Sequence, residues 1–131
     1  MKVLRAFLLA GVATICVAAA DKKTDRFTQG LKKLDLETRL DQVCDYEAMR
    51  RIGRDMKAYR PDRSQSNAIS EPKRNGSTLI AKGAAFRSKG QWYQLSFTCK
   101  GTPDHLGVVS FSYQIGEAIP EAKWEEYGLW R

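Results

Sequence analysis

The sequence predicts an α+β fold in which one amphipathic helix packs on an antiparallel sheet of three or four strands. Apolar residues recur every fourth position over residues 36–52, which indicates a helix with one buried face. From residue 78 onwards the period changes to two, which indicates strands that each bury one face. Each pattern contains one cysteine, Cys44 in the first and Cys99 in the second.

The N-terminus has the pattern of a bacterial secretory signal peptide. Lys2 and Arg5 form a basic start, a mostly apolar stretch follows, and small residues end it at Ala20. The apolar stretch has roughly 15 residues, fewer than the ~20 that a membrane-spanning helix needs, although an uncleaved anchor is the alternative. We therefore expect export to the periplasm. The predicted organisation is a cleaved signal peptide over 1–20, a flexible segment over 21–33 and a single α+β domain over 34–131.

The helix is expected to begin after Asp35, because an aspartate side chain can accept free backbone N–H groups at a helix start. Gly53 is expected to end it. A short strand over Met56–Tyr59 and an exposed loop over 61–77 follow, the loop being rich in Ser, Asn, Pro and charged residues. A loop of this length is unusual in a compact domain, so it is either functional or simply flexible. The predicted buried stripe of the helix consists of Leu36, Leu40, Val43, Cys44, Ala48 and Ile52.

Three strands are expected after this loop, over 78–87, 91–99 and 106–115, joined by turns that contain Gly90, Gly101 and Pro103. The alternation assigns Tyr93, Leu95, Phe97 and Cys99 to one face of the middle strand, and Val109, Phe111, Tyr113 and Ile115 to one face of the last. Trp92 and polar residues occupy the opposite face. A helical turn over 121–127 is expected before the C-terminus.

A structural disulfide between Cys44 and Cys99 is predicted. These are the two cysteines that remain after cleavage, and a lone pair in an oxidising compartment usually bridges. Because Cys44 lies on the apolar stripe and Cys99 on the apolar face of the middle strand, a helix that covers this face brings the sulfurs together. A metal or redox pair is the weaker alternative, since the spacing is far from Cys-x-x-Cys and His105 is the single histidine.

Four blocks of residues carry a resemblance to a protein family. They are Leu34-Asp35-x-x-Thr38-Arg39-Leu40-x-Gln42-x-Cys44-Asp45, Gly83-Ala84-Ala85-Phe86-Arg87-Ser88-Lys89-Gly90-x-Trp92-Tyr93-x-Leu95-x-Phe97-x-Cys99, Asp104-His105 with Phe111-Ser112-Tyr113-x-Ile115-Gly116, and Ile119-Pro120-x-x-x-Trp124. Together they resemble exported alphaproteobacterial proteins grouped as a domain of unknown function, the DUF930 family. The resemblance covers most of the chain and implies a location in the bacterial envelope. It supplies no activity, substrate or catalytic residue.

The sequence contains no motif typical of a nucleophile elbow or a phosphate-binding loop. With a single histidine and two cysteines expected to bridge, neither a metal nor another cofactor is expected. His105 follows Asp104 in a predicted turn, where we expect a solvated histidine, although an Asp-His pair can also serve as a proton donor. The enzymatic alternative is a small envelope hydrolase that uses His105 or the C-terminal carboxylates Glu117, Glu121, Glu125 and Glu126.

Binding is the better supported class of function, because the formal net charge is +7 and favours anionic partners. Cations beside an exposed aromatic ring could hold an anionic envelope component or an acidic protein. In the alternative, which we favour, Trp92 packs under the C-terminal segment against Trp124 or Trp130. The basic residues Lys73 and Arg74 in the long loop form a second candidate contact for anionic polymers. The hypothesis is a non-catalytic periplasmic protein that binds an anionic envelope component or a protein partner, not nucleic acid. The candidate binding residues are Arg87, Lys89, Trp92, Lys100 and His105.

Overall fold

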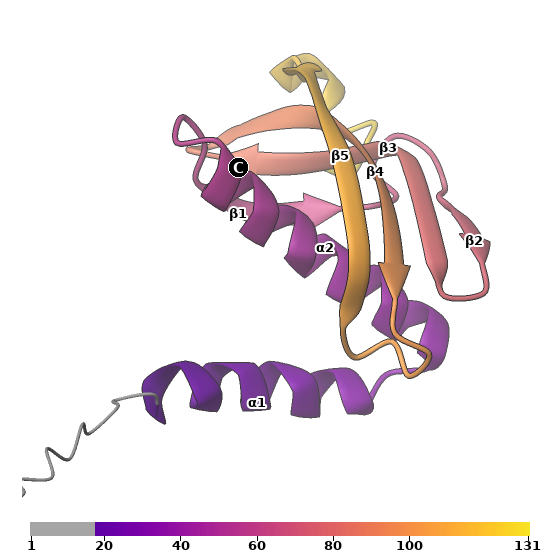
Figure 1. Cartoon of the computed structure of the whole chain (residues 1–131). Coiled ribbons are helices and arrows are strands. Elements are labelled where there is room, and N and C mark those ends of the chain that lie inside the picture. Colours follow the sequence, from indigo (N-terminus) through magenta and orange to yellow (C-terminus); the bar gives the residue numbers. More distant parts are fainter. Residues whose placement is uncertain (1–17) are drawn as a thin grey trace, which may run out of the picture.

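The computed structural model describes residues 18–131 of the chain, with side chains from residue 25 onwards. The predicted signal peptide over 1–20 therefore lies outside the described residues, apart from its last three. The α+β class is confirmed, with five strands where three or four were expected. No helix within the described part of the chain combines the length and the apolar character needed to cross a membrane. The elements are α1 (Ala18–Lys32), α2 (Leu36–Asp55), β1 (Pro61–Gln65), β2 (Lys73–Asn75), β3 (Thr78–Ser88), β4 (Gln91–Gly101), β5 (Val108–Ala118) and the 3-10 helix η1 (Glu121–Lys123) (Figure 1).

The sheet is antiparallel throughout, in the order β1-β3-β4-β5, and β2 also pairs with β3. β1 pairs with residues 85–88 of β3 and β2 with residues 78–80, so both lie along the same edge of β3. The expected loop over 61–77 is therefore wrong at both ends, each of which is a short strand. These strands lie at an edge of the sheet, where β2 is exposed and β1 is only partly buried, so their polar composition is similar to that of a loop.

Helix α2 begins as its sequence pattern predicts. The Asp35 side chain accepts a hydrogen bond from the backbone N–H of Thr38 at 3.0 Å and caps the helix. The helix passes through Gly53 and ends at Asp55, so the expected end was too early. The expected strand over 56–59 is also wrong, because these residues form the turn that leads from α2 into β1.

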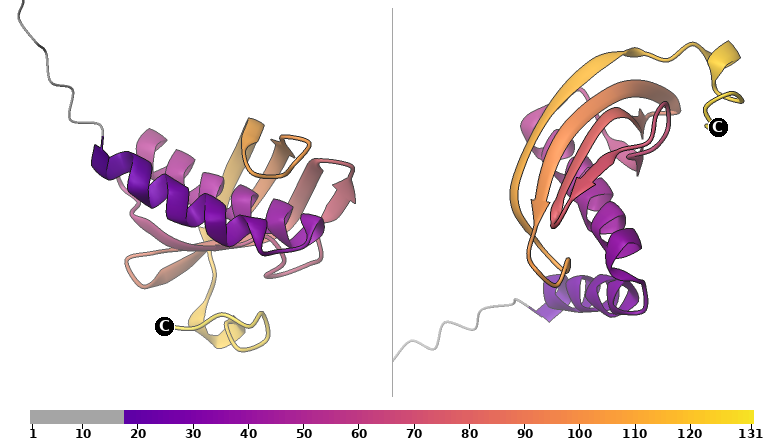
Figure 2. Two further views of the ribbon diagram at one scale, coloured as in Figure 1. Left: turned by 90° about the horizontal axis from the view of Figure 1, so that it is seen from below. Right: turned by 90° about the vertical axis from the view of Figure 1, so that its right-hand side faces the viewer.

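The main core lies between α2 and one face of the sheet, which we call the inner face. Figure 2 shows the long strands bending around the helix. The predicted stripe is buried except for its first residue, Leu36, which is 52% exposed. The buried helix residues are Leu40, Val43, Cys44, Ala48 and Ile52, and the inner-face residues that pack with them include Leu79, Ala81, Ala84, Phe86, Leu95, Phe97 and Cys99. The two periodicities read from the sequence therefore meet in one core.

The predicted disulfide joins Cys44 of α2 to Cys99 of β4, with a Cα–Cα distance of 6.0 Å. Both residues are fully buried in the main core. The bridge joins residues that are 55 positions apart in the sequence. Because β4 lies between β3 and β5, it connects the helix directly to the middle of the sheet.

A helix, α1, occupies most of the segment over 21–33 that the sequence analysis expected to be flexible. The Phe27 ring lies 4.4 Å from the ring of Tyr46 on α2, and Leu31 is buried. Arg39 of α2 donates hydrogen bonds to the carbonyl oxygens of Leu31, Lys32 and Leu34, where α1 ends. These contacts to α2 hold the end of α1 in place.

A smaller second core lies on the other face of the sheet, which we call the outer face. Here the C-terminal segment after β5 packs on the start of β4. The expected helical turn over 121–127 is present as the short helix η1. The buried members of this second core are Ala68, Ala85, Trp92, Ile119, Trp124 and Leu129.

The faces of β5 depart from the predicted alternation at one residue. Phe111, Tyr113 and Ile115 are partly buried and pack against the main core, as expected. Val109 was assigned to the same face but is 60% exposed. The cause is a register shift opposite Lys100 and Gly101, because a bulge reverses the side-chain alternation at its site.

Candidate binding face

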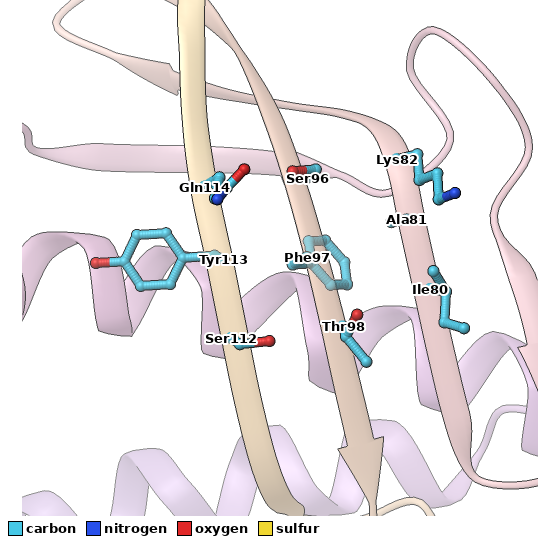
Figure 3. Close-up of a pocket in the computed structure, with 9 residues that line it drawn as sticks. All are labelled: Ile80, Ala81, Lys82, Ser96, Phe97, Thr98, Ser112, Tyr113 and Gln114. Carbon is cyan, nitrogen blue, oxygen red and sulfur yellow. The ribbon is translucent and has the colours of Figure 1, made fainter.

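The outer face of strands β3, β4 and β5 carries an extended surface with many polar side chains. Directly paired residues of neighbouring strands point to the same face, so the register defines its rows. One row contains Ile80, Thr98 and Ser112, and in the next row Ser96 is paired with Gln114. The side chains in these rows lie over a shallow open cavity of about 330 Å³ (Figure 3). The residues that line the cavity are Ile80, Ala81, Lys82, Ser96, Phe97, Thr98, Ser112, Tyr113 and Gln114.

Three exposed lysines belong to this face, and we call them the lysine patch: Lys73, Lys82 and Lys100. Lys82 lines the cavity directly. Lys73 is paired with Ile80, and Lys100 is paired with both Thr78 and Ser110, so both belong to outer-face rows. None of the three forms an ion pair with another described residue. Their charges are therefore available to a ligand.

Acidic residues are almost absent from the strands that form this face. Strands β2 to β5 contain a single carboxylate, that of Glu117 near the end of β5. Two arginines of these strands are already neutralised, since Arg74 pairs with Asp41 at 2.6 Å and Arg87 pairs with Asp62 at 2.8 Å. The lysine patch thus lies on a surface with few carboxylates to oppose it, which favours a positive local potential.

Several carboxylates lie on α2, on the other side of the sheet, where Asp41, Glu47 and Asp55 are paired with arginines. Burial alone would raise the pKa of Glu47, but hydrogen bonds and charge from Arg50 and Arg51 bring it below its usual value. Glu47 accepts from these guanidinium groups at 2.6 Å and 2.7 Å. The chain therefore separates paired charges on the helix from free cations on the sheet.

A second cavity of about 330 Å³ continues the outer face towards the C-terminal segment. It shares Lys82, Ser96 and Gln114 with the first cavity. The loop before β2 approaches β3 so closely that a Cβ atom at Gly83 would lie 2.2 Å from the Ser70 Oγ. Glycine is therefore required at this position. Together the two cavities form one shallow groove with a mixed polar and apolar lining.

Trp92 does not belong to this accessible surface. Its side chain is fully buried, its Nε1–H donates to the Trp130 carbonyl oxygen at 2.7 Å, and the two rings lie 5.5 Å apart. Arg87 lies 5.8 Å from the Trp92 ring, and its hydrogen bonds to Asp62 lower the pKa of that carboxyl group. The structure thus has Trp92 packed under the C-terminal segment, the alternative favoured from the sequence.

The candidate residues chosen from the sequence do not converge on one site. Arg87, Lys89 and Trp92 lie at the β3–β4 turn, and Lys100 lies at the opposite end of β4. His105 lies beyond that end, in the loop before β5. Only Lys100 of this set belongs to the lysine patch.

His105 is a buried structural residue, so the expectation of a solvated histidine is wrong. Its Nδ1 lies 2.6 Å from the Leu36 carbonyl oxygen and its Nε2 lies 3.0 Å from the Ser77 Oγ. The Asp104 carboxylate, which the sequence suggested as a partner of this histidine, accepts hydrogen bonds from the Thr102 hydroxyl and the Leu106 N–H. These hydrogen bonds lower the pKa of Asp104. The imidazole therefore ties the loop before β5 to the start of α2 and to the turn before β3.

Replacing His105 by asparagine is expected to destabilise the protein by about 1–3 kcal/mol, because a shorter side chain leaves a buried hydrogen-bonding group without its partner. Asparagine tolerates the positive φ of 56° at this position, so the backbone conformation is preserved. Urea unfolding measures the loss. Ser77→Ala, which removes one contact only, should be less harmful, and an unchanged unfolding midpoint for His105→Asn would contradict the structural role.

The hydrolase alternative gains little from the C-terminal carboxylates. Glu121 pairs with Arg131, and Glu126 lies 3.5 Å from the Lys123 ammonium group. Glu117 and Glu125 are exposed, and neither outer-face cavity is lined by any of the four. His105 does not line these cavities either, so the accessible groove and the histidine are separate features.

Comparison with known protein families assigns the chain. The family model described as Domain of Unknown Function (DUF930) matches residues 31–129. The chain belongs to the DUF930 family. No curated protein and no solved structure shows a match to it. Membership of this family of unknown function, which the sequence resemblance implied, is confirmed, and the DUF930 region extends over both cores and over the whole outer face.

Most residues of the groove were missed as functional candidates in this DUF930 domain. Ser96, Ser112 and Gln114 were assigned to the polar faces of their strands, which was the available signal. Lys73 was noted as part of a loop, and Lys82 was not singled out. These residues become candidates for one site only when the strand register shows that they lie on one surface.

Proposed function

We propose that this protein is a non-catalytic component of the bacterial cell envelope that binds an anionic polysaccharide along its outer face. The observation that carries the proposal is the lysine patch: Lys82 lines a groove that contains hydroxyl and amide groups, and Lys73 and Lys100 belong to the same face of the sheet. Ammonium groups attract phosphate or carboxylate groups of a polymer, while serine, threonine and glutamine side chains can exchange hydrogen bonds with sugar hydroxyls.

The form of the groove favours a polymer over a small molecule. Pockets for small ligands are usually concave, mostly apolar and able to bury most of the ligand. The outer-face groove is open and extends over two joined cavities, and polar side chains such as Ser96, Thr98 and Gln94 line it beside apolar ones such as Ile69 and Ile80. A chain of sugars can lie across such a surface and contact several cations at once.

A periplasmic location supports the same proposal. The N-terminal sequence has the order of a cleaved signal peptide, and the disulfide between Cys44 and Cys99 suits an oxidising compartment. Anionic polymers such as lipopolysaccharide are then the abundant ligands that the protein would meet.

Replacing the three lysines of the patch by glutamine together is expected to weaken binding to purified lipopolysaccharide about 10- to 100-fold at low salt. The estimate assigns about 0.5–1 kcal/mol to each exposed charge contact. Co-sedimentation with lipopolysaccharide and with peptidoglycan, at low and high salt, measures the change. The wild-type affinity should fall as salt rises, because exposed ionic contacts are screened.

The matched control replaces three exposed lysines outside the outer face, Lys33, Lys57 and Lys89, by glutamine. Both triple variants have the same net charge, so only a localised site distinguishes them. An equal loss of affinity in the two variants would show that binding depends on overall charge and not on the lysine patch. A wild-type protein that does not co-sediment with either polymer at low salt would refute polymer binding.

A further inference from the structure

We propose that β5 is a dimerisation edge, at which two copies of this chain join their sheets in antiparallel register. β5 is the last strand in the sheet order, and β4 is its single strand partner within residues 18–131. Its other edge is lined by backbone N–H and C=O groups that pair with no other part of the described chain. Such an edge is a template for another strand.

The middle of β5 carries none of the usual features that prevent edge pairing. Natural edge strands are commonly protected by charged side chains, proline, short length or bulges. β5 extends over Val108–Ala118, and Glu117 is its only charged residue. Its register shifts lie near its two ends, which leaves the uncharged stretch Ser110–Ile115 in regular pairing with β4. This stretch is therefore open to a further strand.

The pattern of side chains favours a second copy as the occupant. The residues one and two positions from Tyr113 are alike on its two sides, since Ser112 and Gln114 are polar and Phe111 and Ile115 are apolar. In antiparallel pairing centred on Tyr113, Ser112 faces Gln114 of the partner subunit on the outer face. Phe111 then faces Ile115 of the partner subunit on the inner face. The pairing is self-complementary, as a two-fold symmetric interface requires.

Burial at the edge points the same way. Phe111, Tyr113 and Ile115 are only partly buried although they pack on the main core, so an apolar row lies beside the open edge. The Tyr113 hydroxyl donates to Asp55 at 2.9 Å, which anchors this row to the end of α2. A second β5 would cover the row and add backbone hydrogen bonds. The lysine patch lies on β2, β3 and β4, and β5 itself contains no positively charged residue that would repel a second β5.

Joining two copies would also make the two outer faces continuous and bring two lysine patches onto one surface. A polymer that contacts both patches gains avidity, because the second contact is intramolecular. The dimer itself does not depend on the proposed polymer binding, and it is measured without any polymer.

The test is the molar mass of the exported, processed protein by sedimentation velocity over a wide range of concentration, with the variant Ser112→Lys/Gln114→Lys. The wild type is expected to reach the mass of a dimer. The variant is expected to remain monomeric, because lysines from the two subunits would lie opposite one another. Both residues are exposed in the single chain, so the fold should tolerate the change.

The matched control is Ser96→Lys/Thr98→Lys, which adds the same two charges in the same outer-face rows but on the central strand β4. It should dimerise like the wild type. Amide hydrogen exchange in Ser110–Ile115 gives a second measurement and should become slower as the protein concentration rises. A wild type that stays monomeric, or a control that dissociates as readily as the β5 variant, would overturn the proposal.

Discussion

Removing the disulfide by the double substitution Cys44→Ala/Cys99→Ala is expected to lower the free energy of unfolding by roughly 4 kcal/mol. The bridge closes a loop of 55 residues and so restricts the conformations of the unfolded chain. The chain-entropy relation gives a stabilisation of about this size for such a loop. For a domain of this size the melting temperature should fall by about 15–30 °C. Circular dichroism melting curves measure the shift.

The control for this prediction is the wild-type protein melted in the presence of a reducing agent. Reduction removes the same cross-link but keeps both sulfur atoms in the core, so it separates chain entropy from packing. The reduced wild type should approach the double variant and exceed it slightly in stability, because the alanines leave unfilled volume where both cysteines are fully buried. Identical melting of oxidised and reduced wild type would exclude the bridge as a major stabilising feature.

Asp45 should make the protein less stable as the pH rises from about 4 to about 8. It lies on α2 beside Cys44, and burial raises its pKa to about 8, while hydrogen bonds from Ser66 and Ser64 act in the opposite direction. In the unfolded chain the carboxyl group titrates at its ordinary value of 3.8. The folded state thus binds the proton more tightly. The protonated Asp45 side chain therefore makes its full contribution to stability below about pH 4. This contribution decreases as the pH rises and is lost once the pH exceeds about 8.

Asp45→Asn is expected to remove this dependence, because asparagine stays neutral at every pH and keeps nearly the same shape. The variant should match the wild type near pH 4 and exceed its unfolding free energy by about 2 kcal/mol or more at pH 9, where the wild type buries a charge. Urea unfolding of both proteins at each pH provides the comparison.

Asp25→Asn is a suitable control, since Asp25 is an exposed carboxylate of α1. The difference between this variant and the wild type should be small at both pH values. A difference between Asp45→Asn and wild type that does not change with pH would show that Asp45 is already ionised in the folded protein at low pH.

The elements that could be predicted were those with strong local patterns. Asp35 marked the start of α2, and its four-residue period identified the buried side of the helix. The two-residue period found β3, β4 and β5, and it assigned Cys99 to the inner face. Because these patterns depend on near neighbours in the chain, they can be read without knowing the fold.

The missing elements were those that depend on distant partners. β1 and β2 are too short and polar to form alone, and they exist because they pair with opposite halves of β3. The end of α1 is held by Arg39, which reaches back from α2 to its last carbonyl groups. His105 was misjudged for the same reason, since both partners of its ring are far away in sequence.

By itself the sequence determined the α+β class, the core faces of the helix and long strands, the disulfide and the family, because periodicity and cysteine placement are local properties. Only the tertiary structure decided which polar residues share a surface and which strand lies at the edge of the sheet. Lys73, Lys82 and Lys100 are separated along the chain and lie on one face only through the pairing of β2, β3 and β4. Strand register and strand order are long-range properties, set by contacts between distant segments rather than by the residues adjacent to each position.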